Sequence, residues 1–203
     1  MKTVTILINN FENAYLYYDE ATKNGVVIDP GGDADKILRV INDAGVQVSA
    51  ILLTHGHFDH INAADEVKNA TGARIYAHFE DEEKLLDKEP IFVWDVKKSV
   101  VADVFVREGE VISAGGSSLS VIHTPGHTSG SICFYDEAEK VIFSGDTLFR
   151  RSVGRSDLPT GDGETLIKSI KEKLFVLPDS VMVYPGHEEK TDIGYEKKYN
   201  PYV

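Results

Sequence analysis

Short apolar runs separated by polar turns recur along the whole chain and predict β-strands. Asn, Asp and Gly residues interrupt the runs, and these residue types favour the turns that join strands. The runs that we interpret as strands cover residues 4–8, 14–18, 25–29, 48–53, 74–77, 104–107, 111–113, 119–122, 131–135, 141–143 and 181–184.

Helical spacing of apolar residues appears between some of these runs. Asp33 is placed to cap a helix that presents Ile37 and Ile41 on one face, and Gly45 would end it. Residues 88–99 show no clear period and predict either a flap over a site or a surface connection. Strands followed by helices, twice along the chain, predict an α/β fold in which two sheets face each other and helices cover their outer faces. The remaining predicted helices cover residues 61–70, 79–87, 165–174 and 191–198.

Length, composition and charge narrow the class of protein. The 203 residues predict a single domain, residues 1–203, with an ordinary share of hydrophobic (42%) and charged (27%) residues. A net charge of −12 disfavours a nucleic-acid surface and binding to an anionic membrane, because both need clustered Lys and Arg. Residues 1–10 lack the apolar core of a signal peptide and no run reaches transmembrane length, so we expect a cytoplasmic protein. The one cysteine, Cys133, lies in an apolar run, where a buried inert thiol is expected.

Four potential metal ligands lie within six residues, directly after the apolar run 51–53: His55, His57, Asp59 and His60. A single loop histidine is usually solvated, but clustered His and carboxylate are the ligand set of zinc, iron and manganese. If the segment is extended, His55, His57 and Asp59 project to one side, and His60 follows where the chain turns. This geometry suits two metal ions close together better than one.

Three later strands also end in ligand-type residues next to a glycine: His127, Asp146 and His187. Taken singly, each is explained by turn chemistry. Together with the histidine-rich loop, they predict one shared site. We exclude two histidines from it: His78, which we expect to be exposed, and His123, which the intervening Pro-Gly should turn elsewhere.

The ligand segments carry a family resemblance. Thr-His-Gly-His-Phe-Asp-His, Thr-Pro-Gly-His-Thr, Ser-Gly-Asp-Thr-Leu and Tyr-Pro-Gly-His, in this order, resemble the metallo-β-lactamase superfamily over nearly the whole chain. The closer match looks like the glyoxalase II-like hydrolases, through residues 153–159 and 196–201. The resemblance implies a four-layer αββα sandwich, as the strand and helix pattern does.

The resemblance also implies a ligand set and a chemistry. It implies two divalent metal ions, zinc first, with iron or manganese as alternatives. A hydroxide between them would attack a thioester, and Asp59 would also orient this nucleophile or receive its proton. The implied ligands are His55, His57 and His127 for one metal, Asp59, His60 and His187 for the second, and Asp146 bridging both.

Residues near the ligands are candidates for supporting roles. We expect Arg155 and Asp157 to pair and to brace the loop beyond Asp146. Candidates for substrate contact are Tyr184, Arg150 and Arg151. Full-length glyoxalase II enzymes carry a C-terminal helical extension that helps bind glutathione, whereas this chain ends soon after His187. We therefore expect the short form, a monomer or homodimer acting on a small-molecule thioester.

Three other functions fit parts of the pattern. A persulfide dioxygenase-like protein would hold a single iron with His55, His127 and Asp146. A non-enzymatic metal-binding protein needs a site without an open coordination position, which nothing in the ligand set suggests. A lactone or β-lactam hydrolase would use the same two metals on a different substrate.

Overall fold

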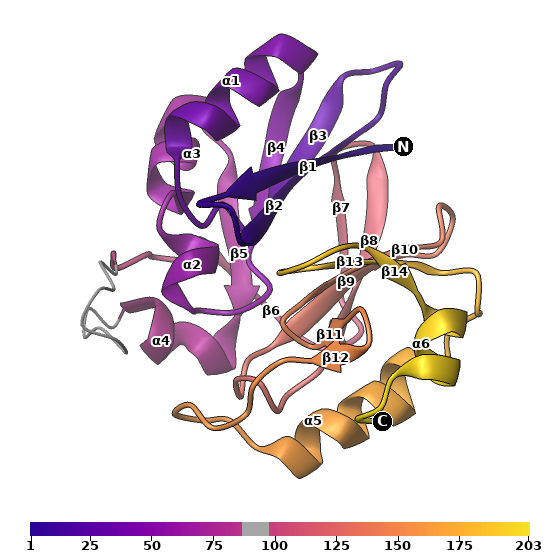
Figure 1. Ribbon diagram of the computed structural model, residues 1–203. Coiled ribbons are helices and arrows are strands. Elements are labelled where there is room, and N and C mark those ends of the chain that lie inside the picture. The colour runs from indigo at the N-terminus through magenta and orange to yellow at the C-terminus, as the bar shows by residue number, and fades with distance from the viewer. Residues whose placement is uncertain (87–97) are drawn as a thin grey trace.

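Two six-stranded sheets face each other in the computed structural model, which describes residues 1–86 and 98–203 (Figure 1). The first sheet has the order β1-β2-β3-β4-β5-β6. Its first three strands are antiparallel, and β3 to β6 run parallel, with the connections between β3, β4 and β5 passing through helices. The strands are β1 (Lys2–Ile8), β2 (Glu12–Tyr18), β3 (Asn24–Ile28), β4 (Gln47–Leu52), β5 (Arg74–His78) and β6 (Val104–Val106).

The second sheet has the order β14-β13-β10-β9-β8-β7. A separate two-stranded hairpin, which the sequence pattern missed, follows β10 and consists of β11 (Leu148–Phe149) and β12 (Ser152–Val153). The strands of the second sheet are β7 (Val111–Ala114), β8 (Ser117–His123), β9 (Ile132–Asp136), β10 (Val141–Gly145), β13 (Met182–Pro185) and β14 (Thr191–Asp192).

Helices cover the outer face of each sheet, as predicted. Figure 1 shows α1 and α3 on the outer side of the first sheet and α5 and α6 beside the second. The helices are α1 (Ala34–Ala44), α2 (Phe58–Ile61), α3 (Ala64–Thr71), α4 (Glu82–Leu86), α5 (Gly163–Ser169) and α6 (Ile193–Tyr199), with a 3₁₀ turn η1 (Phe79–Asp81) and a π-helical turn η2 (Ile170–Leu174). The αββα sandwich is therefore confirmed.

Strand β2 shows how the apolar pattern produces these layers. All seven of its residues are buried. Tyr15 and Tyr17 face the layer between the two sheets, whereas Ala14, Leu16 and Tyr18 face the layer under α1 and α3. Because alternate side chains point to opposite faces, the part of the strand covered on both sides by these layers, residues 14–18, is a continuous apolar run.

The helix boundaries follow local hydrogen bonding. Asp33 caps α1 by accepting from the Lys36 N–H, and Gly45 ends it in the left-handed region, both as predicted. The helix predicted over 61–70 is divided into α2 and α3, because the chain turns where the Ala63 N–H donates to the Pro30 carbonyl (2.9 Å). The segment predicted as a helix over 191–198 first pairs as β14, and α6 begins only after it.

Two expectations remain, one on residues 88–99 and one on membrane-spanning segments. The flap or surface connection predicted for 88–99 lies outside the described residues, apart from Lys98 and Ser99. Within residues 1–86 and 98–203, the helices are too short or too polar to cross a membrane.

Candidate metal centre

The predicted ligand residues meet at one edge of the sandwich. His55 follows β4 in the first sheet, whereas His127, Asp146 and His187 follow β8, β10 and β13 of the second sheet closely along the chain. The two sheets are joined at this edge, where the Ile132 N–H donates to the Thr54 carbonyl (2.9 Å). Four loops distant in sequence therefore reach one small volume.

The histidine-rich loop is extended only in its first half. His57 has extended backbone, but α2 begins at Phe58, so Asp59 and His60 come from the first turn of a helix. The condition under which His55, His57 and Asp59 would project to one side, an extended segment, is therefore not met beyond His57. The helical turn directs Asp59 and His60 to a second point beside the first.

His55, His57 and His127 form the first group of ligand atoms. Nδ1 of His57 lies 2.8 Å from Nε2 of His127, which lies 3.2 Å from Nε2 of His55. Unprotonated ring nitrogens repel each other at this distance, unless a proton or a cation lies between them. Burial lowers the pKa of His57 to about 3 and that of His55 well below its usual value, so both rings are neutral and able to bind a metal.

Asp59, His60 and His187 form the second group. Nε2 of His187 lies 3.3 Å from Oδ2 of Asp59, and Nε2 of His60 lies 3.9 Å from the same oxygen. Asp146 lies between the groups: Oδ2 is 3.5 Å from Nε2 of both His127 and His187, and Oδ1 is 3.4 Å from Nε2 of His60. Asp146 therefore lies within reach of ligand atoms from both groups and would be able to hold a cation in either.

Partners on the far side of three rings direct Nε2 toward the centre. Nδ1 of His60 bonds the Asp29 carboxylate (3.0 Å), Nδ1 of His127 bonds the Arg155 carbonyl (2.7 Å), and Nδ1 of His187 bonds the Phe11 carbonyl (2.7 Å). Because these oxygens only accept, each Nδ1 donates to them and Nε2 is the nitrogen that faces the centre, where a metal can bind it.

The chemistry of the donor set fits divalent cations. Nε2 of His60 and Oδ1 of Asp146 are buried and have no hydrogen-bond partner, although buried polar atoms nearly always have one. Burial disfavours a charged His60 ring, but the carboxylates of Asp146 and Asp59 override it and raise the pKa to about 10. Burial is likewise overridden at His187, whose pKa the same carboxylates raise to about 11. These carboxylates attract positive charge, and a divalent cation would displace the ring protons.

Comparison with known proteins agrees with this geometry. A sequence model of the metallo-beta-lactamase superfamily matches residues 8–187. This chain belongs to the metallo-β-lactamase superfamily. It is 37% identical to the hydroxyacylglutathione hydrolase GloC of Haemophilus influenzae over 197 residues, which cover 95% of this chain and 92% of that protein.

Two solved structures share the fold over nearly the whole chain. The BLEG-1 B3 metallo-beta-lactamase superposes with a TM-score of 0.94 at 36% identity, covering 99% of each chain. TTHA1623 in a di-iron-bound form superposes with a TM-score of 0.84 at 37% identity, covering 100% of each chain. The glyoxalase II-like resemblance within the superfamily is supported by the GloC match.

A cavity of about 450 Å³ opens beside the ligands, and Arg155 lines it. As expected, Arg155 pairs with Asp157 through two bonds of 2.7 and 2.8 Å, and its carbonyl holds His127. The three residues that we expected to contact substrate, Tyr184, Arg150 and Arg151, do not line this cavity. Tyr184 packs between the sheets against Tyr15 and Phe143, Arg150 pairs with Glu189, and the Arg151 backbone bonds Glu196.

Two buried carboxylates that the sequence analysis missed support the ligand loops. Asp29 accepts from the N–H and hydroxyl of Thr54 (2.8 and 2.6 Å) as well as from His60. Asp81 accepts from the Gly56 N–H (2.8 Å) in the first ligand loop and from the Thr128 hydroxyl (2.8 Å) next to His127. Asp29 could have been found from its place in Ile-Asp-Pro-Gly-Gly at a strand end, but Asp81 lies in an acidic run that resembles a solvated helix.

Two further predictions concern residues outside the centre. His78 is buried, not exposed as expected, and its ring stacks on that of His123 at 4.2 Å. Together with Glu80, these two histidines place three potential ligand atoms within 4.8 Å of one another, apart from the predicted centre. Cys133 is buried as predicted, and burial raises the pKa of its thiol to about 11.

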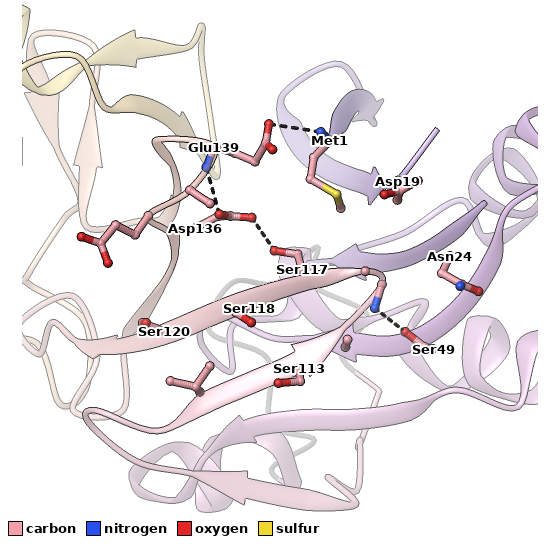
Figure 2. A pocket seen from close by; sticks show the side chains of 16 residues that line it. Met1, Asp19, Asn24, Ser49, Ser113, Ser117, Ser118, Ser120, Asp136 and Glu139 are labelled. Atoms are coloured by element: carbon pink, nitrogen blue, oxygen red, sulfur yellow. Dashed lines mark hydrogen bonds and ion pairs between the residues drawn. The ribbon is translucent and has the colours of Figure 1, made fainter. Parts of the chain in front are cut away.

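A larger hollow of about 1070 Å³ lies at the opposite end of the strands (Figure 2). Some of its polar groups have partners within the protein: Asp136 accepts from the hydroxyls of Ser117 and Tyr17, and the Gly115 N–H donates to Ser49. None of the predicted metal ligands, which all lie in the described part of the chain, lines this hollow.

Proposed function

We propose that this protein is a dinuclear metallohydrolase that cleaves small thioesters. The observation that carries the proposal is the Asp146 carboxylate, which faces His127 of one ligand group and both His60 and His187 of the other. Two bound divalent cations would supply Lewis acidity and lower the pKa of a water molecule toward neutrality. The similarity to GloC supports a thioester as the substrate.

The side chains have distinct tasks in this reaction. Asp59 lines the cavity and is ionised, because the nearby rings of His60 and His187 overcome the effect of burial and lower its pKa. It is therefore placed to orient the attacking water and to accept its proton. Attack on the carbonyl carbon forms a C–O bond and breaks the C–S bond, and the thiolate leaves and takes up a proton. Cys133 is excluded as a nucleophile because it is buried and stays protonated.

A thioester panel tests the proposal. Purified protein loaded with zinc is assayed against acyl-glutathione, acyl-CoA and acyl-N-acetylcysteamine, and released thiol is measured. We expect turnover of at least one substrate and a loss of about 100-fold or more in kcat for Asp59→Asn. Absence of turnover across the panel would remove the thioesterase assignment.

β-Lactam hydrolysis is a second candidate function, favoured by the similarity to the BLEG-1 structure. A lactam and a lactone added to the same panel compare it directly by kcat/KM. The iron dioxygenase alternative needs only His55, His127 and Asp146, which leaves Asp59 and His187 without a role. Elemental analysis of natively purified protein distinguishes the dioxygenase from the hydrolase. One iron per chain with oxygen uptake supports the dioxygenase, and two metals per chain support the hydrolase.

A further inference from the structure

The cavity beside the ligands is lined by apolar side chains as well as by ligands. The ligand side chains that line it include His57, Asp59 and His187. A set of apolar residues, which we call the apolar wall, also lines it: Phe11, Phe58, Phe149, Val153 and Leu158. A water-filled site needs no such wall, whereas an apolar group bound there would be removed from water along with it.

The aromatic part of the wall is held firmly next to a ligand. Asn9 and Asn10 both take left-handed backbone (φ 50° and 66°), which forms the tight turn that presents Phe11. The Phe11 ring stacks on His187 with centroids 5.8 Å apart and planes 6° apart, and Phe149 approaches His187 edge-on at 5.9 Å. Phe11 nevertheless remains 49% exposed, which leaves much of its surface for a bound molecule.

Away from the metal groups, few charged side chains line this cavity to recognise an anionic carrier. Apart from the ligands, the charged residues described as lining it are Arg155 and Glu188. The Arg155 guanidinium is already bonded twice by Asp157. A net charge of −12 also repels anions approaching from solution.

We propose that the apolar wall binds the acyl group of the substrate and selects a thioester with a hydrophobic acyl group on an uncharged carrier. This inference rests on the proposed function, which it narrows from small thioesters in general to one chemical class. Glutathione and coenzyme A are anionic, so this cavity offers their carriers little charge complementarity. One added apolar group in such a pocket changes kcat/KM by about 10-fold or more.

The test varies the acyl group and the carrier separately. Phenylacetyl and lactoyl thioesters of N-acetylcysteamine and of glutathione are compared by kcat/KM on zinc-loaded protein. The variants are Phe11→Ala, Leu158→Ala and Leu158→Lys. The matched control is Phe105→Ala, an exposed phenylalanine on β6 that does not line the cavity. Phenylacetate and acetate binding, measured by calorimetry, gives a readout that does not depend on turnover.

We expect kcat/KM for the phenylacetyl thioester of N-acetylcysteamine to be about 10-fold higher than for the lactoyl thioester of the same carrier. We expect it to be about 10-fold higher than for the phenylacetyl thioester of glutathione as well. Phe11→Ala and Leu158→Ala should remove the acyl preference. Leu158→Lys should remove it too and, because it adds a positive charge to the cavity, should also shift the carrier preference toward glutathione. Phe105→Ala should change neither preference. Turnover without these preferences would overturn the inference and leave the thioesterase intact. If no thioester is cleaved, the thioesterase assignment is refuted, and the binding measurement then tests the apolar wall separately. Phenylacetate binding no tighter than acetate binding would refute the wall as an acyl-binding site. Phenylacetate binding that is about 10-fold tighter than acetate binding, and that is lost in Phe11→Ala, would support it.

Discussion

Asp29→Asn is the sharpest test of how the metal centre is held. Asp29 is 2% exposed, and its Oδ2 accepts from Nδ1 of His60 and from the Thr54 hydroxyl, which in turn contacts Nδ1 of His55. Asn has the same shape and tolerates the left-handed backbone at this position (φ 47°). The substitution therefore changes hydrogen bonding with little effect on the backbone.

The expected effect follows from the tautomer of His60. An amide NH₂ facing Nδ1 would be a donor opposite a donor, so the ring would move its proton to Nε2, the nitrogen that faces Asp146. Loss of one such partner weakens metal binding by about 10-fold, or about 1.4 kcal/mol. If the change also reaches His55 through Thr54, the loss rises toward about 100-fold.

The assay is zinc competition against a chromophoric chelator, with metal stoichiometry and thermal unfolding measured in parallel. Asp33→Asn is the matched control, because Asp33 is also left-handed (φ 44°), lies four residues away, and only caps α1. Asn caps a helix as well as Asp does, so the control should bind zinc like the parent protein. The reasoning is refuted if Asp29→Asn binds two zinc ions within twofold of the affinity of Asp33→Asn.

Three further predictions follow from the same geometry. Removing metal with a chelator should abolish turnover and lower Tm by about 10 °C, because metal at a thousandfold excess over its Kd stabilises the folded state by about 4 kcal/mol. An unchanged Tm would contradict a centre that stabilises the fold. Gly186→Ala should reduce the metal content to about one per chain by elemental analysis, because its Cβ would fall 2.3 Å from Oδ1 of Asp146 and 2.6 Å from Cε1 of His60; two tightly bound metals in this variant would refute it. Cys133, with a pKa raised to about 11 by burial, should resist alkylation at about pH 8 and react fully in denaturant, and labelling of the folded protein would show that the thiol is accessible.

The layers of the fold and the ligand loops could be predicted from the sequence for a physical reason. The parts of β2 and β4 that are buried on both faces, residues 14–18 and 50–52, are continuous apolar runs, and ligands placed just after such runs are visible as polar breaks. His127, Asp146 and His187 were therefore predicted together from one rule. The β11–β12 hairpin was missed, because its two-residue strands are too short to produce a period, whereas the π-helical turn η2 lies within the helix predicted over 165–174.

The supporting groups were less visible because their role depends on contacts that cross the fold. Asp81 lies in a run of acidic residues, and only the packing of η1 against two loops shows that it accepts bonds from Gly56 and Thr128. His78 ends a strand like a solvent-facing residue, yet it is covered by the second sheet through His123. Such roles depend on contacts between segments that are distant in the sequence, and the local pattern of apolar and polar residues does not predict these contacts.

Both metal groups draw their ligands from both sheets, which makes the centre a link across the sandwich. The first group combines His55 and His57 of the first sheet with His127 of the second, and the second group joins Asp59 and His60 to His187. A cation bound in either group therefore stabilises the packing of one half of the chain on the other, because unfolding separates the ligands and loses the binding energy. The buried carboxylates Asp29 and Asp81 act on the same interface from behind the ligands, so rigidity of the site and stability of the sandwich arise from the same contacts.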